Sequence, residues 1–256
     1  MKQPIPIELG ALIQPESYFN WIDYYDQVSS THEVAEKMIQ TNPQVKPGIV
    51  IADFQSAGKG RFNKSWDSKT PGLDLLMTLI IHPQVGKQSY AKMSFPIGIA
   101  IREALLDYVP SHVNIQLKWP NDILINQQKC VGILITSKSD WNAVMVGIGI
   151  NVNQDPSSVN RTSLAAINHH QLSRWDVLND VISSLNQHIA DIRMCRVNHE
   201  QWTQCSAYLN ENVTIKTANE EFCGCYRGIN EQGGLRLEFN NQIHEINRGY
   251  EFRQVK

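Results

Sequence analysis

The run Lys118-Trp119-Pro120-Asn121-Asp122 combines a cation, an aromatic ring, a rigid turn, an amide and a carboxylate within five residues. Proline fixes φ, and Asn and Asp tolerate tight turns, so the run predicts a turn that enters a strand at 123–125. After a polar reversal, a second apolar run, Cys130–Ile135, returns beside the first. This hairpin brings Lys129 close to Asp122. An opposed cation and carboxylate beside a cleft suit the activation of an anion.

A second chemical segment is the loop from Gln55 to Trp66, which joins two apolar runs. Its glycines admit close backbone approach, and Lys59, Arg61 and Lys64 place three cations within six positions. Such cations neutralise a phosphate while free amide groups cradle its oxygens, so the loop is predicted to fold over an anion. The Walker spacing of phosphate loops is absent. Taken alone, the segment also fits a mobile, solvated basic loop.

Local patterns predict the elements that must position these segments. Ser30 and Glu33 form a Ser-x-x-Glu capping box that opens a helix ending near Asn42-Pro43. Ser173 opens a long helix with apolar residues at helical spacing up to Ile192. Further strands are predicted at 48–52, 73–81 and 143–150, and a helix at 90–108 with Pro96 disturbing its first turns.

The sequence pattern changes beyond about Trp202, where short predicted strands replace the mixture of strands and helices. Short strands parted by turn residues are typical of a small β-barrel, and they are predicted at 213–216, 223–229, 235–239 and 243–246. Strands mixed with helices, followed by an all-β tail, predict the α+β class. We therefore expect a mixed-sheet domain over residues 1–207 and a β-barrel domain over residues 208–256.

Composition bounds the function. The chain has 256 residues, 42% of them apolar, and 23 basic residues against 25 acidic, with a pI near 6.4. This near balance argues against a broad nucleic-acid-binding surface. Met1–Gln14 lacks a signal-peptide pattern, and no apolar run approaches the length of a membrane span. Five cysteines without metal-ligand spacing indicate reduced thiols and a cytoplasmic location, with no metal site.

Taken together, three stretches resemble the biotin protein ligases in order and spacing. The glycine-arginine loop of that family is commonly Gly-Arg-Gly-Arg-x-Gly-Arg-x-Trp, and here Gly58–Trp66 aligns with it without a gap. The pattern Lys-Trp-Pro-Asn-Asp, then Lys, then Gly-Ile-Leu matches fully at 118–134, and 147–153 follows as the third stretch. The segment Asp26–His32 is similar to the family's Asp-Ser-Thr-Asn region.

The resemblance implies a fold and an activity. The fold would be the class II synthetase-like ligase domain with a Src-homology-type barrel. The activity would be ATP-dependent conversion of biotin to biotinyl-5'-AMP, then transfer to a lysine of a biotin carboxyl carrier protein, with Mg²⁺ accompanying ATP. No nucleic-acid partner is expected, because too little chain precedes Asp26 for a helix-turn-helix module, and no membrane partner is expected, because no apolar run is long enough to span a membrane. A homodimer would be unsurprising.

The resemblance also assigns roles to residues. The catalytic candidates are Lys129, Arg61 and Asp122. The residues implied to bind biotin are Ser30, Thr31, Gln55, Gly58, Lys59, Lys129 and Gly132. Those implied to bind the nucleotide are Lys59, Arg61, Trp66, Asn121 and Asn151. Arg161–Leu164 is a weaker match on the adenine side.

Several of these residues also have a simpler structural explanation. Ser30 is explained as a helix cap alone, Lys129 as a solvated hairpin lysine, and Trp119 is favoured as a core aromatic. The pair His169-His170 is interpreted as a surface feature because other ligands are lacking. Asp122 fits either a base that helps the carrier lysine or a phosphate-site or metal-site residue.

The chain departs from the family pattern at several positions. Lysine replaces arginine at 59 and 64, which loses bidentate phosphate contact and predicts weaker retention of the adenylate. Asn63 replaces a glycine, Asp74 stands where the family often has Asn, and Gly249-Tyr250-Glu251 interrupts the usual Gly-Glu.

Two rival functions stay open. A lipoate or octanoate ligase or transferase acting on a lipoyl domain would use a cysteine or lysine beside the acyl site, and Cys130 follows Lys129. Adjacent strand residues face opposite sides, however, so Cys130 is predicted to pack inward. The other rival, a biotin-responsive repressor, needs the DNA-binding module discussed above, and the sequence therefore predicts a monofunctional ligase.

Overall fold

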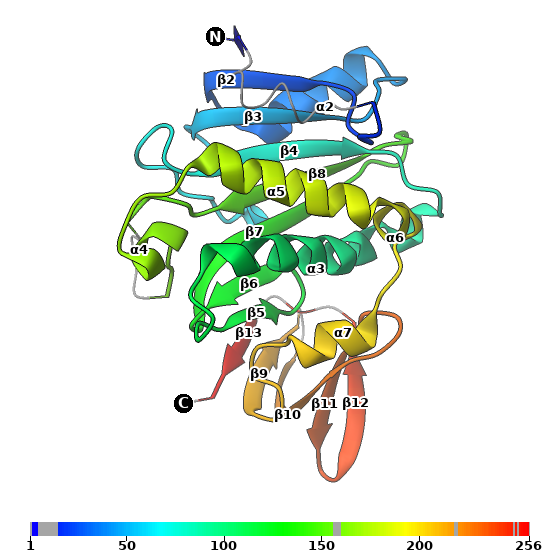
Figure 1. Cartoon of the computed structure of the whole chain (residues 1–256). Helices are drawn as coiled ribbons and strands as arrows, with labels where there is room; N and C mark the ends of the chain where they lie inside the picture. The colour runs from blue at the N-terminus through cyan, green and yellow to red at the C-terminus, as the bar shows by residue number, and fades with distance from the viewer. Residues whose placement is uncertain are drawn as a thin grey trace.

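The computed structural model describes residues 2–4, 15–155, 160–217, 220–247, 249 and 251–255. These residues form an eight-stranded mixed sheet with flanking helices, followed by a smaller antiparallel sheet of five strands (Figure 1). The predicted α+β class, a mixed-sheet domain with a C-terminal barrel, is confirmed. The calls on Met1 and on residues 5–14 of the lead-in, and on Tyr250, lie outside the described residues.

The large sheet carries several of the predicted site residues. Only β2 and β3 run parallel, and every other neighbouring pair is antiparallel. In spatial order its strands are β1 (Lys2–Gln3), β2 (Ile22–Val28), β3 (Gly48–Gln55), β4 (Leu75–Ile81), β8 (Val144–Ile150), β7 (Gln128–Thr136), β6 (Asp122–Ile125) and β5 (Ile115–Lys118). The continuous apolar runs of β4 and β8 are covered on both faces, which explains their central position.

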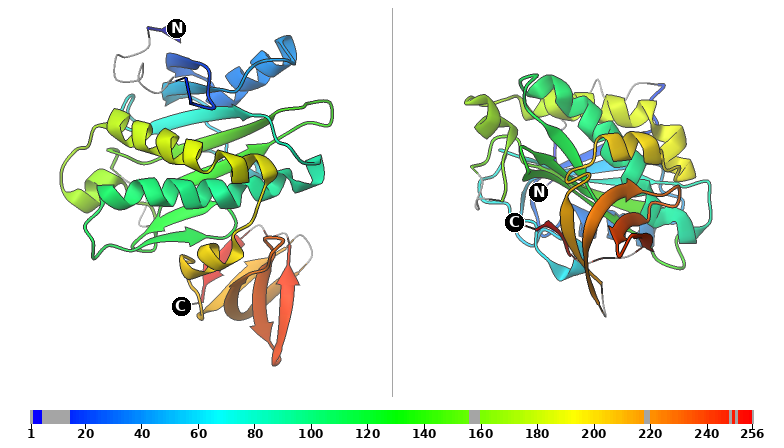
Figure 2. Two further views of the ribbon diagram at one scale, coloured as in Figure 1. Left: turned by 45° about the vertical axis from the view of Figure 1, so that its right-hand side comes forward. Right: turned by 90° about the horizontal axis from the view of Figure 1, so that it is seen from below.

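Helices cover both faces of this sheet. Helices α3 (Ser94–Leu105) and α5 (Arg174–Gln187) lie side by side across one face, and α2 (Thr31–Thr41) covers the other (Figures 1 and 2). Ser30 caps α2 as predicted, because its side chain accepts from the backbone N–H of His32. Each face therefore has its own apolar core.

Two predicted helices differ from the structure. The helix predicted from residue 90 begins at Ser94, after a 3₁₀ segment, Lys87–Met93. Pro96 consequently falls in the first turn, where its missing N–H has no helical partner to lose. The same helix ends at Leu105, with a 3₁₀ turn to Tyr108. The helix predicted from Ser173 to Ile192 breaks at His188, and α6 (Ile189–Met194) continues separately.

The hairpin predicted around residue 126 is confirmed. Asn126 and Gln127 both have positive φ, 49° and 64°, which is the conformation of a two-residue hairpin turn. Lys118 pairs with Asp122 across β5 and β6, and Asp122 pairs with Gly132 across β6 and β7. Three residues of the predicted constellation therefore lie on adjacent strands.

The four predicted barrel strands are confirmed, and a fifth was not predicted. They are β9 (Asn212–Lys216), β10 (Glu221–Ile229), β11 (Leu235–Phe239), β12 (Gln242–Ile246) and β13 (Glu251–Gln254). Two short helices, α4 (Leu164–Asn168) and α7 (His199–Gln204), lie outside the two sheets. The boundary predicted at 207–208 stays a prediction.

Trp119 joins the barrel to the large sheet. Its side chain is 4% exposed, its Nε1 donates to the carbonyl of Gly233 at 2.9 Å, and its ring lies 6.4 Å from that of Phe252. The prediction that Trp119 is a core aromatic is confirmed. Because Asn121 and Asp122 follow directly, the barrel contact also fixes the turn that carries them.

Candidate functional site

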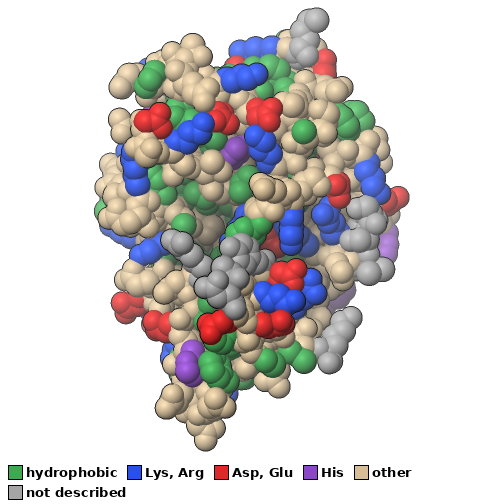
Figure 3. All heavy atoms as spheres, turned by 180° about the vertical axis from the view of Figure 1, so that it is seen from behind, with side chains coloured by type: hydrophobic (Ala, Val, Ile, Leu, Met, Phe, Trp, Pro, Cys, Tyr) green, Lys and Arg blue, Asp and Glu red, His purple; other side chains and the backbone are tan. Residues whose placement is uncertain are grey.

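A cavity of about 210 Å³ lies where the N-terminus of α2, the loop 57–66 and the hairpin β6–β7 meet. From behind, lysine and arginine side chains gather in the middle of the molecule, above the barrel (Figure 3). The predicted residues that line the cavity are Ser30, Thr31, Gln55, Lys59, Arg61, Trp66, Asn121, Asp122, Lys129 and Gly132. The structure thus brings together residues that are more than 100 positions apart in sequence.

One end of the cavity is buried and hydrogen-bonded. The side-chain oxygen of Gln55 accepts from the backbone N–H of Thr31 at 2.8 Å and lies 3.1 Å from its hydroxyl. That hydroxyl is 2.9 Å from the hydroxyl of Thr78 on β4. Because all three residues are buried, their donors and acceptors are fixed in direction before any ligand arrives. Thr78 was missed by sequence reasoning, since it is a lone polar residue within an apolar strand.

His32 lies beside this network, between α2 and β8. It is 5% exposed, and neither ring nitrogen has a hydrogen-bond partner. A Cβ at Gly147 would lie 3.2 Å from its Nδ1, so the glycine admits the ring. Burial, with a further contribution from Lys59, lowers the pKa of His32 to about 4. The imidazole is therefore neutral at physiological pH.

The other end of the cavity is cationic. Lys129 Nζ lies 2.6 Å from Asp122 Oδ1, as the hairpin prediction required. Arg61 donates from Nη1 to Asn121 Oδ1 at 2.9 Å, which ties the loop to the turn after β5. Desolvation lowers the pKa of Arg61, with Asp122 opposing that shift. A partly desolvated cation interacts more strongly with an incoming anion than one in bulk water.

Lys118 adds charge behind this end. Desolvation lowers its pKa, and Asp122 opposes the shift while Lys129 and Arg253 add to it. Lys118 and Arg253 line a smaller cavity of about 160 Å³ that shares Arg61, Asn121 and Asp122 with the main one. A concentration of positive charge of this kind stabilises a polyanion.

Trp66 lies across two glycine backbones. A Cβ at Gly149 would come within 2.4 Å of its ring and one at Gly132 within 2.7 Å. Lys129 Nζ is 5.5 Å from the ring centroid, within reach of a cation–π contact. The indole Nε1 is buried without a partner. Glycine at 132 and 149 is thus explained by close approach of this ring.

Gly58 and Asn151 do not line the main cavity. At Gly58 a Cβ would lie 2.5 Å from the carbonyl of Trp66, so the glycine serves the closure of the loop. The Asn151 amide is buried and donates to the carbonyl of Thr162 at 2.9 Å, which holds the segment that carries Arg161. Their predicted contacts with ligand stay predictions.

Lys59 has an unforeseen partner. Its Nζ lies 3.0 Å from Glu33 Oε1, and Ser29 donates to the other oxygen of Glu33 at 2.5 Å. The pair is largely exposed, so it contributes little stability. It does direct Lys59 toward Glu33 in the first turn of α2.

Asp74 anchors the chain that follows β8. Its Oδ1 accepts from the backbone N–H of Val152 at 2.8 Å and of Gln154 at 3.3 Å. Gln154 in turn accepts from the backbone N–H of Lys69 at 2.8 Å. Burial raises the pKa of Asp74, although these backbone donors oppose the shift. Asp74 therefore supports the chain that follows β8, and it does not line the main cavity.

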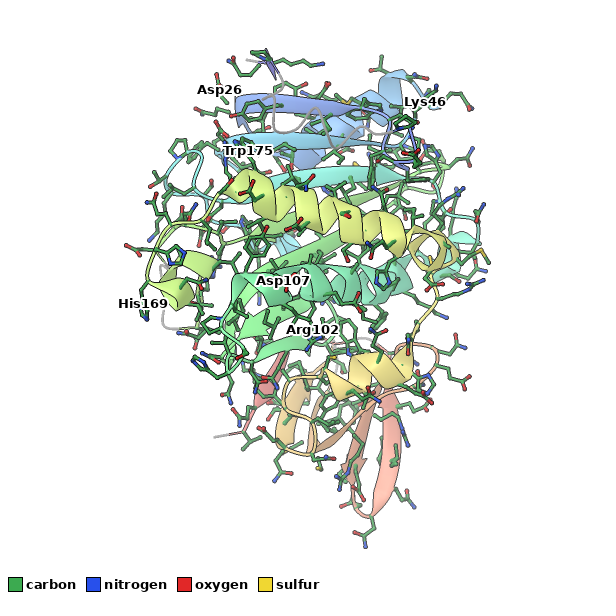
Figure 4. The ribbon with its side chains drawn as sticks, in the orientation of Figure 1. Asp26, Lys46, Arg102, Asp107, His169 and Trp175 are labelled. Carbon is green, nitrogen blue, oxygen red and sulfur yellow. The ribbon has the colours of Figure 1, made fainter. Side chains whose placement is uncertain are left out.

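Other candidates are not site residues. Cys130 is fully buried, as predicted, and burial raises its pKa. His169 and His170 are exposed, as predicted, and Figure 4 shows His169 beyond α4. Across the described ranges, no group of three His, Cys, Asp or Glu side chains is placed to hold a metal ion. In the same ranges, no helix has the length and apolar character needed to cross a membrane.

The fold and the cavity define a class of protein: a mixed-sheet domain with a C-terminal barrel and a ligand cavity under a glycine- and cation-rich loop. The description "Biotin/lipoate A/B protein ligase family" matches residues 24–153. The chain belongs to this family, and the prediction of a ligase of this kind is confirmed.

Relatives support the assignment. A protein named bifunctional ligase/repressor BirA from Bacillus subtilis is 30% identical over 234 residues, which cover 87% of this chain and 71% of that protein. A biotin–[acetyl-CoA-carboxylase] ligase from Paracoccus denitrificans is 28% identical over 76% of this chain and 87% of its own length. Among solved structures, a biotin protein ligase from Aquifex aeolicus in complex with biotin and ATP shares the fold. Its TM-score is 0.80 at 24% identity, covering 93% of this chain and 100% of that one.

Proposed function

We propose that this protein activates biotin with ATP to form biotinyl-5'-AMP and transfers the biotinyl group to a lysine of a biotin carboxyl carrier protein. One observation carries the proposal. A single cavity joins a buried, hydrogen-bonded end at Thr31, Gln55 and Thr78 to a cationic end at Lys129 and Arg61. Relatives named as biotin ligases support the choice of acid.

The buried end suits the ureido ring of biotin. Such a ring offers two N–H donors and one carbonyl acceptor on an otherwise apolar molecule. Ser30, Thr31 and Gln55 present hydroxyl and amide groups that match this pattern, and Leu134 and the ring of Trp66 supply apolar wall. A mostly apolar pocket with a few fixed polar groups is the usual construction of a small-molecule site.

The cationic end suits the activation step. A carboxylate oxygen of biotin attacks the α-phosphorus of ATP, and the bond to the leaving pyrophosphate breaks with its electron pair on pyrophosphate. Two anions must approach each other, so positive charge is needed around the crowded α-phosphate. Lys129 supplies it from the hairpin and Arg61 from the loop.

Mg²⁺ is expected to accompany ATP. Asp122 is the carboxylate in the cavity wall, and its Oδ1 is held by Lys129. With no cluster of three metal-ligating side chains among the described residues, phosphate oxygens and water would supply most of the coordination. Asp122 would add one oxygen to the metal or orient Lys129.

Two wider expectations belong to the same proposal. All five cysteines are free, and Cys223 is exposed, which fits a protein that works in the reducing cytoplasm. Activity on lipoate or octanoate is the alternative. It is disfavoured because Cys130, its candidate nucleophile, is buried behind the sheet with a raised pKa.

The proposal is tested by following both half-reactions. Purified protein with ATP, Mg²⁺ and biotin should form a compound with the mass of biotinyl-5'-AMP. Addition of a purified biotin carboxyl carrier domain should then move the biotinyl mass onto that domain and release AMP. Absence of the adenylate with folded protein would contradict the proposal.

A further inference from the structure

Three of the cations that line the main cavity are each paired with a carboxylate. The nitrogen–oxygen distances are 2.6 Å for Lys129 and Asp122, 3.0 Å for Lys59 and Glu33, and 3.1 Å for Arg161 and Asp67. Of the three acids, Asp122 lines the cavity, and Glu33 and Asp67 lie outside its wall. Two acids outside the wall therefore hold cations that belong to the wall.

Asp67 holds Arg161 beside the loop that covers the cavity. It follows Trp66 in the chain, and its Oδ1 accepts from the hydroxyl of Ser65 at 3.4 Å. Its Oδ2 accepts from Nη1 of Arg161 at 3.1 Å, and the Arg161 guanidinium lies 6.0 Å from the centroid of the Trp66 ring. The carboxylate thus fixes the direction of the guanidinium group.

The backbone of Arg161 is held separately from its side chain. Lys129 donates its backbone N–H to the carbonyl of Asn160 at 2.9 Å, and Thr162 donates to the carbonyl of Lys129 at 3.0 Å. These bonds keep Arg161 next to Lys129 whatever its guanidinium contacts. An exchange of partner by Arg161 therefore requires movement of the side chain alone.

Glu33 is a second acid of this kind. It lies in the first turn of α2, where one oxygen is held by Lys59 and the other accepts from the hydroxyl of Ser29. The side chains of Lys59 and Glu33 are 43% and 36% exposed, and those of Arg161 and Asp67 are 30% and 47% exposed. Exposed ion pairs contribute little to stability, so an incoming anion takes either cation at low cost.

These pairings oppose the entry of a polyanion. The triphosphate of ATP carries several negative charges, and each carboxylate occupies a donor that the phosphate oxygens need. Each carboxylate also places like charge near the cavity, which weakens the binding of a negatively charged ligand. The two acids therefore act on the nucleotide, and biotin at the hydrogen-bonded end is affected much less.

We propose that Glu33 and Asp67 are counter-charges that hold Lys59 and Arg161 and release them to the phosphates of the nucleotide. The two acids thereby lower the affinity for ATP, and they regain their cations when pyrophosphate or AMP leaves. The inference rests on the proposed function and deepens it by naming two residues that set nucleotide affinity. No bond to either acid forms or breaks, so both are positioning residues.

Neutral variants of the same shape isolate the charge. We would compare wild type with Asp67→Asn and Glu33→Gln in biotin-dependent pyrophosphate–ATP exchange. A calorimetric titration with α,β-methylene-ATP in the presence of biotin would measure nucleotide binding alone, because this analogue cannot be cleaved to the adenylate.

Two further acids supply matched controls. Asp191→Asn removes an acid that is 48% exposed and paired with Arg196 on the surface, which matches Asp67 in exposure. Glu36→Gln removes an acid on α2 that is paired with Lys138. Neither acid holds a cation of the main cavity.

Each neutral variant should lower the KM for ATP and the Kd of the analogue about threefold, because a cation becomes available and a like charge is removed. The KM for biotin and kcat should stay within about twofold of wild type, and both controls should match wild type. The gain from Asp67→Asn should disappear in an Arg161→Met background, because the acid then has no guanidinium to hold.

Unchanged or weaker nucleotide binding in both variants would overturn the inference. Equal gains in the controls, or a full gain that persists in the Arg161→Met background, would also overturn it, since the acids would then act through general charge. If folded wild type binds the analogue but shows no exchange, the proposed function is contradicted, and the binding series still decides the inference. No binding of the analogue by wild type would overturn both.

Discussion

The two ends of the cavity are built in opposite ways. At the hydrogen-bonded end, Thr31, Gln55 and Thr78 are each buried and are held by one another across α2, β3 and β4. At the cationic end, Arg61 comes from the loop 57–66, in which Lys64 is exposed and Lys59 is paired to the half-exposed Glu33. The first end is preorganised by the core, and the second depends on local loop contacts.

The tip of the loop, residues 62–65, is exposed. It is closed by backbone bonds from Gly60 to Lys64 and from Trp66 to Gly58, and Phe62 and Asn63 adopt positive φ. Segments with few buried contacts open at low cost in free energy. Under the proposed function, a small apolar acid would meet a fixed site, and the nucleotide would meet cations on a segment with few buried contacts.

The largest expected effect is at the cationic end. Replacing Lys129 by Met removes the positive charge next to Asp122 and should lower kcat for biotin-dependent pyrophosphate–ATP exchange by about a hundredfold or more. The KM for biotin should change much less. Lys138→Met, an exposed lysine just after β7 that pairs with Glu36, is the control and should retain full exchange. A Lys129→Met enzyme within threefold of wild type would show that the cation is not needed.

The lowered pKa of the buried His32 gives a test of the packing at the hydrogen-bonded end. His32 has a folded pKa of about 4 against 6.5 unfolded, so the unfolded chain binds a proton that the fold excludes. Stability should fall as pH drops from about 7.5 to 5, by about 2 kcal/mol from this group alone. His32→Asn removes the titrating group. Urea unfolding of both proteins at the two pH values measures the difference, and identical pH dependence would refute the assignment.

A milder change at the same end is Thr78→Val, which keeps the shape and removes one hydroxyl. The KM for biotin should rise about fivefold with kcat nearly unchanged, because the lost hydrogen bond supports binding in ground and transition states alike. Thr214→Val in the barrel strand β9 is the control. A fall in kcat with unchanged KM would place Thr78 in the chemistry instead.

The smallest expected effect concerns retention of the adenylate by the loop. Lys59→Arg restores the bidentate cation of the family pattern and should slow dissociation of the adenylate about threefold. The expected gain is small because the side chain here is directed to Glu33. Release of labelled adenylate from both proteins gives the rates. If the adenylate dissociates from the variant no more slowly than from wild type, the hypothesis that lysine weakens its retention is wrong.

Much of the site followed from local sequence because its residues occur in contiguous motifs. The hairpin placed Lys129 beside Asp122, since two strands and a short turn fix the register between them. The capping box likewise located the start of α2 at Ser30. Short-range geometry of this kind is encoded within about fifteen residues.

The missed features depend on long-range packing. Thr78 is polar within an apolar strand, and only the pairing of β3 with β4 brings it near Gln55 and Thr31. Strand β2 was not predicted, because polar residues interrupt its apolar ones and it gains its place by pairing with β3. The break at His188 coincides with a tertiary contact, because the His188 ring lies 2.7 Å from Glu103 on α3.

A part-buried polar cluster was also not predicted. Asp53 lies 2.5 Å from Arg174 and accepts from the Tyr24 hydroxyl at 2.6 Å. Trp175, at the start of α5, packs edge-on against Tyr24 (Figure 4). The residues come from three separate elements, so the local sequence around each one does not predict the contact. The backbone carbonyl of Asp53 also accepts from the backbone N–H of Gly72, in the segment before β4.

The most direct test of the central claim is pyrophosphate–ATP exchange with biotin, lipoate and octanoate offered separately to the purified protein. A fixed hydrogen-bonded end shaped for a ureido ring predicts exchange with biotin, and rates with the other two acids near the acid-free background. Exchange with lipoate or octanoate equal to or above that with biotin, or no exchange with any acid by folded protein, would contradict the account.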